Sequence, residues 1–246
     1  MTKKYINEVS KDYDKCILLD SILSKLFVVS VIISIILHFA KNDILCVGLI
    51  VIHIIYILID LINDVIYKNY AEDERRKTLL SNAFSKDLSL KQTKGYYNNN
   101  EKNSIKKLGI NAFESTLFSK NTSKKMLINE GIKFTIVFII WIIFMINNED
   151  INLMVLITQT IFSAEILVNL IKLCYFFFKS NDLYNQFYRM FIANEYNESQ
   201  TALLLEYVFE YECMKNYCHI LLSEKIFEID NPTLKKEWAK ISKKIK

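Results

Sequence analysis

Four strongly apolar runs alternate with polar segments along the chain, at 26–40, 44–59, 134–148 and 151–178. A membrane-spanning helix needs about 20 mostly apolar residues. Flanking Lys and Tyr side chains can extend a shorter run into the membrane interface. Three of the runs are apolar on every side rather than along one face, which favours spanning helices over the core helices of a soluble bundle. The pattern therefore predicts four transmembrane helices.

The composition favours long helices. Among 246 residues there are only 4 Gly and 1 Pro, so residues that form turns are scarce. The first apolar run follows a polar stretch of mixed charge, and no small-residue cleavage site comes after it. We therefore expect it to be a retained anchor rather than a cleaved signal peptide.

The distribution of charge predicts the orientation. Segment 68–129 contains 13 Lys or Arg against 6 Asp or Glu, whereas the short turn 147–150 carries two acidic residues. Loops rich in Lys and Arg stay on the cytoplasmic side of the membrane. We expect the central segment and both termini to be cytoplasmic, in a multi-pass protein of the inner membrane.

The predicted fold is all-α, with two transmembrane hairpins and a helical cytosolic region built from the central segment and the C-terminal tail. In chain order, the expected parts are an N-terminal helix, the first hairpin, the sensing segment, the second hairpin and the C-terminal helices. Their predicted ranges are 1–24, 25–67, 68–129, 130–178 and 179–246.

The central segment is expected to form two helices. Residues 68–94 should continue the second span as one long helix, because no Gly or Pro interrupts the chain there. Gly95 and the Tyr and Asn residues after it predict a turn. Apolar residues at helical spacing predict a returning helix over 101–128.

The tail is also expected to be helical. One long amphipathic helix is predicted over about 199–228, and Asp230–Pro232 reads as a stop-and-restart signal. The final helix is basic, with one apolar side that includes Trp238. Two positions remain open for it, on the anionic inner leaflet or packed on the cytosolic bundle.

Polar residues fall along one face of two spans. On the second span they are His53, Tyr56, Asp60 and Asn63. On the fourth span they are Thr158, Glu165, Asn169 and Lys172. Ionisable groups inside a membrane are costly and usually functional. The two stripes could pair within the bundle, a His or Lys neutralising a carboxylate, or line a hydrated path between assembled copies. The candidate path residues are His53, Asp60, Glu165 and Asn169.

The sequence contains no motif of a conventional active site. It lacks a glycine-rich phosphate loop, a nucleophile elbow and a zinc-protease helix. The five cysteines are scattered and odd in number, which argues against a disulfide framework. Cys213 and Cys218 point in different directions on a helix, so a metal site is not indicated. We expect a protein that is not an enzyme and has no cofactor or metal.

The central segment instead has the groups that a phosphorylated ligand needs. Arg side chains offer forked donors to phosphate, Tyr rings can stack on a base, and Asn amides can bind base edges. The candidate ligand-binding residues are Arg75, Arg76, Tyr96, Tyr97, Asn98 and Asn99. On composition alone, the segment is better explained as a positive-inside loop with interfacial tyrosines.

Several of these stretches resemble the SMODS-associated four-transmembrane effector family of CBASS anti-phage systems. The similar stretches are 74–89, 93–126 and the tail from "LSEKIF" to "KKEWAKI". The most specific are "GYYNN" and the run with Asn111, Phe113, Glu114 and Ser115. The chain departs from the family pattern at Ser81 and Leu117, where an acidic and an aromatic residue are usual.

The resemblance implies an antiviral function. Such effectors are encoded beside a nucleotidyltransferase that makes a cyclic oligonucleotide messenger during infection. The effector binds the messenger in the cytosol, oligomerises or opens, and disrupts the inner membrane, so that the infected cell dies. The implied partners are the messenger, the lipid bilayer and further copies of the chain, with no DNA or RNA polymer.

Two other functions remain open. The chain could be a non-catalytic membrane scaffold or accessory subunit whose basic segment binds anionic lipid. It could also be a carrier that uses Glu165 and His53, although carriers usually have internal repeats and broken helices, and the two hairpins show no obvious similarity.

Overall fold

A computed structural model describes residues 6–40, 42–91, 93–94, 97, 99, 101–147, 166–194 and 196–245. The described chain is helical apart from one antiparallel pair of two-residue strands, β1 and β2, which confirms the all-α prediction in outline. The elements are β1 Ile6–Asn7, α1 Ser10–Phe39, α2 Asp43–Ile62, the π-helix η1 Asn63–Lys68, α3 Asn69–Phe84, β2 Thr93–Lys94, α4 Ile105–Asn147, α6 Ile166–Tyr188, the π-helix η2 Arg189–Ala193, the 3₁₀-helix η3 Glu198–Gln200, α7 Thr201–Cys218 and α8 Glu224–Ser242.

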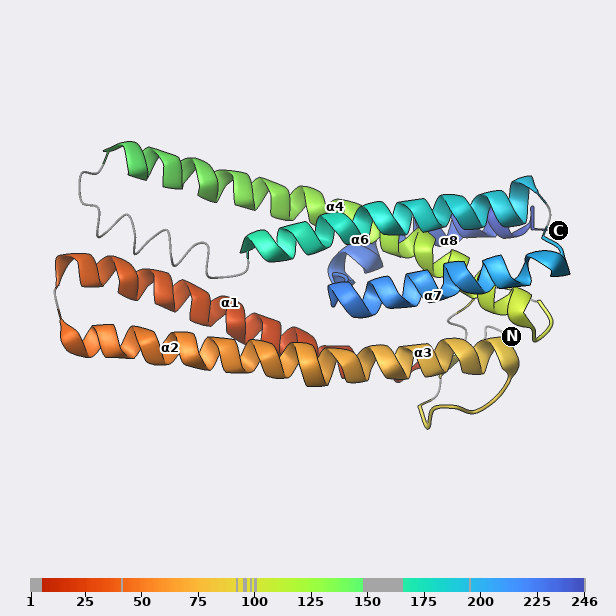
Figure 1. The fold of residues 1–246 in the computed structure, drawn as a ribbon, viewed down its shortest axis with the longest axis horizontal. Coiled ribbons are helices and arrows are strands. Elements are labelled where there is room, and N and C mark those ends of the chain that lie inside the picture. The colour runs from red at the N-terminus through yellow and green to blue at the C-terminus, as the bar shows by residue number, and fades with distance from the viewer. Residues whose placement is uncertain are drawn as a thin grey trace.

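Three helices are long and apolar enough to cross a membrane, which gives the chain the character of a membrane protein. They run over Ser10–Leu37, Asp43–Phe84 and Ile105–Ile143. Their apolar ends extend beyond the other helices, at the left of Figure 1, while both chain ends lie at the opposite side. Ile44 and Ile146 are about four-fifths exposed there, as expected of side chains that face lipid.

The fourth expected span is only partly described. Residues 151–165 lie outside the described residues, and α6 begins at Ile166. The first half of α6 packs along α4, and its second half enters the polar bundle (Figure 1). Here "polar bundle" means α3, the first half of α4, the second half of α6, α7 and α8.

The second span and the central segment form one continuous helix. Elements α2, η1 and α3 follow each other without a break over Asp43–Phe84, as predicted up to residue 84. The expected continuation to residue 94 is wrong. Ser85 takes a left-handed conformation with φ of 51° and ends the helix. The Ser81 hydroxyl accepts the Leu88 N–H at 3.1 Å, which holds the chain as it turns back.

Helix α4 joins the returning segment to the third span. It begins at Ile105, just after Ser104, whose hydroxyl accepts the Lys107 N–H at 3.2 Å. It then runs for 43 residues to Asn147. The predicted helix over 101–128 and the predicted third span are therefore one rigid element.

The core of the polar bundle is aromatic. The ring of Phe113 on α4 lies 5.2 Å from that of Trp238 on α8 and 5.9 Å from that of Phe187 on α6. All three residues are fully or almost fully buried. Of the two positions left open for the final helix, packing on the bundle is therefore the one observed.

The predicted layout of the tail is wrong in two respects. Helix α7 ends at Cys218, where His219 adopts a left-handed conformation with φ of 50°. Helix α8 begins at Glu224 and passes through Pro232 without restarting. Proline inside a helix removes one hydrogen bond, and the burial of Leu234 and Trp238 farther along α8 offsets that loss.

Candidate functional site

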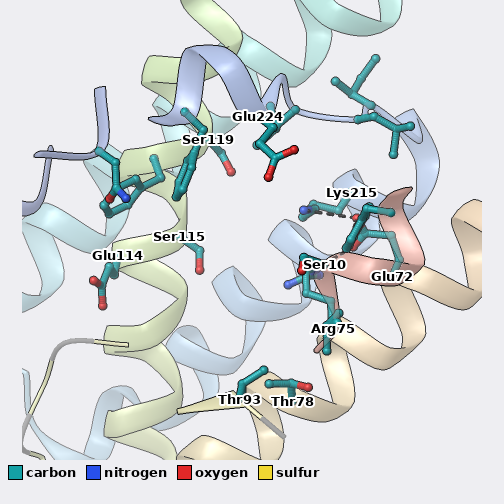
Figure 2. Close-up of a pocket in the computed structure, with 18 of the residues that line it drawn as sticks. Ser10, Glu72, Arg75, Thr78, Thr93, Glu114, Ser115, Ser119, Lys215 and Glu224 are labelled. Atoms are coloured by element: carbon teal, nitrogen blue, oxygen red, sulfur yellow. Dashed lines mark hydrogen bonds and ion pairs between the residues drawn. The ribbon is translucent and has the colours of Figure 1, made fainter. Parts of the chain in front are cut away.

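The polar bundle and the start of α1 line an open cavity of about 500 Å³. Its walls come from the start of α1, from α3, from the first half of α4, and from α7 and α8, and the β2 strand borders it (Figure 2). A volume of this size is typical of pockets that bind small molecules. The cavity is the candidate functional site.

A buried network of charges forms one wall of the cavity. Glu72 on α3 accepts hydrogen bonds from the Tyr13 hydroxyl of α1 at 2.8 Å and from Nε of Arg75 at 2.7 Å. Arg75 also pairs with Glu212 of α7, and Lys215 Nζ lies 3.3 Å from Glu72. Two carboxylates thus balance two cations, and the network joins three helices. Losing one member of such a buried set leaves an uncompensated charge.

Of the two cations in this network, Lys215 has fewer ion pairs: Arg75 pairs with Glu72 and Glu212, whereas Lys215 pairs with Glu72 alone among the described residues. It is 9% exposed and lines the cavity, where Figure 2 shows it directed toward Glu72. Burial lowers its pKa below the ordinary value of 10.5; Glu72 and Glu212 act in the opposite direction, and Arg75 adds to the lowering. Among the described residues, Glu72 is its only ion-pair partner.

Two residues that line the cavity each have a buried polar atom without a hydrogen-bond partner among the described residues. The Thr78 hydroxyl, on the helix that carries Arg75, has no hydrogen-bond partner among the described residues, and Thr78 is 7% exposed. The side-chain oxygen of Asn231 on α8 also lacks a partner within the described chain. Such atoms are costly in a folded protein and usually have a partner.

The structure separates the predicted ligand-binding residues. Arg75 and Tyr97 line the cavity. Arg76 is on the outer side of α3, where it pairs with Asp73 at 3.0 Å. Asn99 donates to Asn111 of α4 at 2.6 Å, and it is not a lining residue. Tyr96 and Asn98 lie outside the described residues.

The predicted path residues do not form one group in the described structure. His53 Nδ1 lies 3.0 Å from the carbonyl oxygen of Leu49, one turn earlier on the same helix. Asn169 is exposed on α6, Asp60 is half-buried, and Glu165 lies outside the described residues. Within the described chain, neither an ion pair nor a hydrogen bond joins His53 to Asp60.

A different polar cluster lies where the apolar helices meet the polar bundle. The amide of Asn63 donates to Asp20 of α1 at 2.7 Å, and Lys68 pairs with Asp64 at 2.8 Å and Asp20 at 3.5 Å. Lys172 of α6 reaches Asp64 at 3.8 Å. Of the two partners predicted for Lys172, Asp60 forms no ion pair with it among the described residues, and Glu165 lies outside them. The π-helix η1 carries three members of this junction cluster, and its wider turn shifts the face predicted from regular spacing.

Sequence reasoning missed Thr78 and Lys215. Lys215 did leave a signal, because it follows Leu204, Val208 and Tyr211 on one buried face of α7. A lysine at an otherwise apolar helical face is expected to be buried and to need a partner. Thr78 left no comparable signal.

Comparison of the chain with protein-family models, curated proteins and solved structures finds no match. Within the described residues, no group of three or more His, Cys, Asp or Glu side chains is arranged to hold a metal ion. The chemistry of the site therefore has to be read from the cavity itself.

Proposed function

We propose that the chain is a membrane effector of a CBASS antiviral system, which binds a cyclic oligonucleotide in the cavity and then permeabilises the inner membrane. The observation that carries this proposal is the continuity between the cavity walls and the apolar helices. Element α3 extends α2, α4 includes the third apolar stretch, and α1 begins at the cavity with Tyr13. A ligand in the cavity would therefore touch three helices that enter the membrane.

The groups that line the cavity suit a nucleotide. Arg75 and Lys215 supply positive charge for phosphates. Tyr97, Phe118 and Phe227 supply aromatic surface for bases. Carboxylates of α8 also line the cavity, and they can accept hydrogen bonds from the amino groups of bases.

In the proposed topology, four helices span the inner membrane and both termini are cytoplasmic, so the polar bundle is in the compartment where the messenger is made. One bundle of four helices is too narrow to enclose a pore, so permeabilisation requires several copies. The ligand favours the open assembly only by binding it more tightly than the closed state.

The test is leakage of dye and ions from liposomes that contain the purified full chain, with cyclic di- and trinucleotides added one at a time. We expect one member of the panel to trigger leakage. The Tyr97→Ala variant should respond only at higher ligand concentrations, because it loses a stacking surface in the cavity. Its control is Arg76→Met, which changes the outer side of α3 and should leak like the wild type.

Leakage without any nucleotide, or none with the whole panel in inserted and folded protein, would contradict the proposal. The second result would favour a scaffold that binds anionic lipid.

A further inference from the structure

We propose that Lys215, Arg75 and Thr78 form the anion-binding wall of the cavity and take the phosphate groups of its ligand. The inference uses the cavity of the proposed function, but it does not depend on the ligand being a cyclic nucleotide or on membrane leakage. It adds Thr78 of α3 and Lys215 of α7 to Arg75, which the sequence already indicated.

The first argument is the state of Lys215. An ammonium group has three N–H donors, and within the described chain this one has a single ion-pair partner, 3.3 Å away. The side chain is nine-tenths buried, so water has little access to the remaining donors. Burying an ammonium group with unmet donors is costly. A phosphate oxygen in the cavity would supply the missing acceptors.

The second argument is the hydroxyl of Thr78. A buried threonine in a helix usually donates to a carbonyl oxygen of the preceding turn, but this hydroxyl has no partner among the described residues. Thr78 itself is among the residues that line the cavity, one helical turn after Arg75 (Figure 2). Because the Thr78 hydroxyl forms no hydrogen bond in the ligand-free protein as described, we infer that it donates one to the ligand.

The third argument is the balance of charge. Glu72 and Glu212 already neutralise Arg75 and Lys215, so the wall holds a closed ion network when no ligand is present. An anion that binds Lys215 competes with Glu72. Because Glu72 also accepts from Tyr13 of α1, this competition loosens the contact between α1 and α3.

Helix α8 contributes a hydrogen-bond acceptor to the cavity lining, in contrast to the donors Lys215 and Thr78 on the other helices. Asn231 lines the cavity, and its side-chain oxygen has no hydrogen-bond donor among the described residues. A ligand that carries both phosphate oxygens and N–H groups satisfies Asn231 together with Lys215 and Thr78. Nucleotides have this combination, whereas inorganic phosphate meets only the anionic part.

The decisive variant is Thr78→Val, which keeps the shape of the side chain and removes the hydroxyl. Because that hydroxyl has no partner in the described structure, its removal should leave the melting temperature unchanged or slightly higher. We expect affinity to fall about tenfold, the usual effect of losing one hydrogen bond to a charged group. Titration calorimetry on the full chain in detergent would measure binding of pyrophosphate and of a cyclic dinucleotide panel.

The matched control is Lys77→Met, one residue away on the outer side of α3, where Lys77 pairs with Asp73 and Glu74. It removes a positive charge and should bind each probe like the wild type. Lys215→Met should lose most of the affinity, and Lys215→Arg, which keeps the charge, should retain most of it. If Lys215→Met does not fold, Thr78→Val and Lys215→Arg still decide the matter.

A second experiment, with liposomes, distinguishes a soluble phosphate ligand from a lipid headgroup. Binding of soluble probes that depends on Thr78 assigns the wall to a soluble ligand. If binding depends on Thr78 only with phosphatidylglycerol liposomes, and not with phosphatidylcholine liposomes, the wall binds a lipid headgroup. That result would support the anion-binding wall but contradict the proposal that a cyclic nucleotide binds there. Equal affinities for wild type and Thr78→Val, or no binding of any phosphate probe, would overturn the inference.

Discussion

At the scale of the residue, Lys215 predicts how binding depends on pH. Its pKa in the folded chain is lower than 10.5, because burial outweighs its carboxylate partners. Between the two values the folded chain holds fewer protons on Lys215 than the unfolded chain, so this residue makes the ligand-free protein more stable as pH rises there. Anion binding needs the charged form, so affinity should fall as pH rises through the lowered pKa of Lys215.

Titrations of pyrophosphate binding against pH would check this prediction in the wild type and in Lys215→Arg. Arginine remains charged throughout, so the variant should lose the alkaline fall. The other groups at this wall are Tyr13, Glu72, Arg75, Tyr211 and Glu212. An equal fall in both proteins would contradict the assignment of this pH dependence to Lys215.

Some residues of the cavity could be predicted from the sequence, and others could not. Forked donors and stacking rings in a basic segment predicted ligand contacts for Arg75 and Tyr97, and the structure places both residues at the cavity. The same reasoning selected Arg76, because composition does not say which of two neighbouring arginines faces inward. Lys215 and Thr78 depend on the packing of α7 against α3, which involves contacts between residues more than 100 positions apart.

At the scale of the element, Gly109 and Gly131 on α4 form a matched pair. A Cβ atom at Gly109 would lie 2.4 Å from a methyl carbon of Leu204, whereas one at Gly131 would meet nothing within 4 Å. Gly109→Ala should therefore push α7 away from α4 and cost about 1–3 kcal/mol. Gly131→Ala should leave stability unchanged or improve it by up to about 1 kcal/mol through helix propensity.

Thermal unfolding in detergent would compare the two glycine variants with the wild type. Because α4 and α7 both line the cavity, Gly109→Ala should also weaken binding of the phosphate probes. Equal melting temperatures for both variants would show that α7 does not pack on α4 as closely as the structure has it.

The continuous helices could be predicted because the sequence offers nothing to stop them. No Gly or Pro lies between 49 and 84, and α2, η1 and α3 follow without a break. The ends at Ser85 and His219 could not be predicted, since residues other than glycine rarely take positive φ. Tertiary contacts fix both ends: Ser85 accepts from Asn103, and His219 lies 3.2 Å from Asn69.

At the scale of the whole molecule, the proposed topology predicts which positions face the cytoplasm. In a variant without its natural cysteines, Asp43→Cys at the start of α2 should react with a membrane-impermeant maleimide on cells whose outer membrane has been removed. Asn197→Cys, before α7, should react only after the inner membrane is opened. Labelling of both positions on closed cells would contradict cytoplasmic termini.

In the proposed function the whole molecule acts as one unit, in which occupancy of the cavity changes the arrangement of the apolar helices. The most direct measurement is to record ligand binding and dye leakage on the same liposomes as the triggering nucleotide is increased, for wild type, Thr78→Val and Lys77→Met. We expect leakage to follow occupancy in all three, with Thr78→Val shifted to about tenfold higher concentration and Lys77→Met superimposed on the wild type. Full occupancy of the cavity without leakage, or leakage that ignores occupancy, would contradict the account.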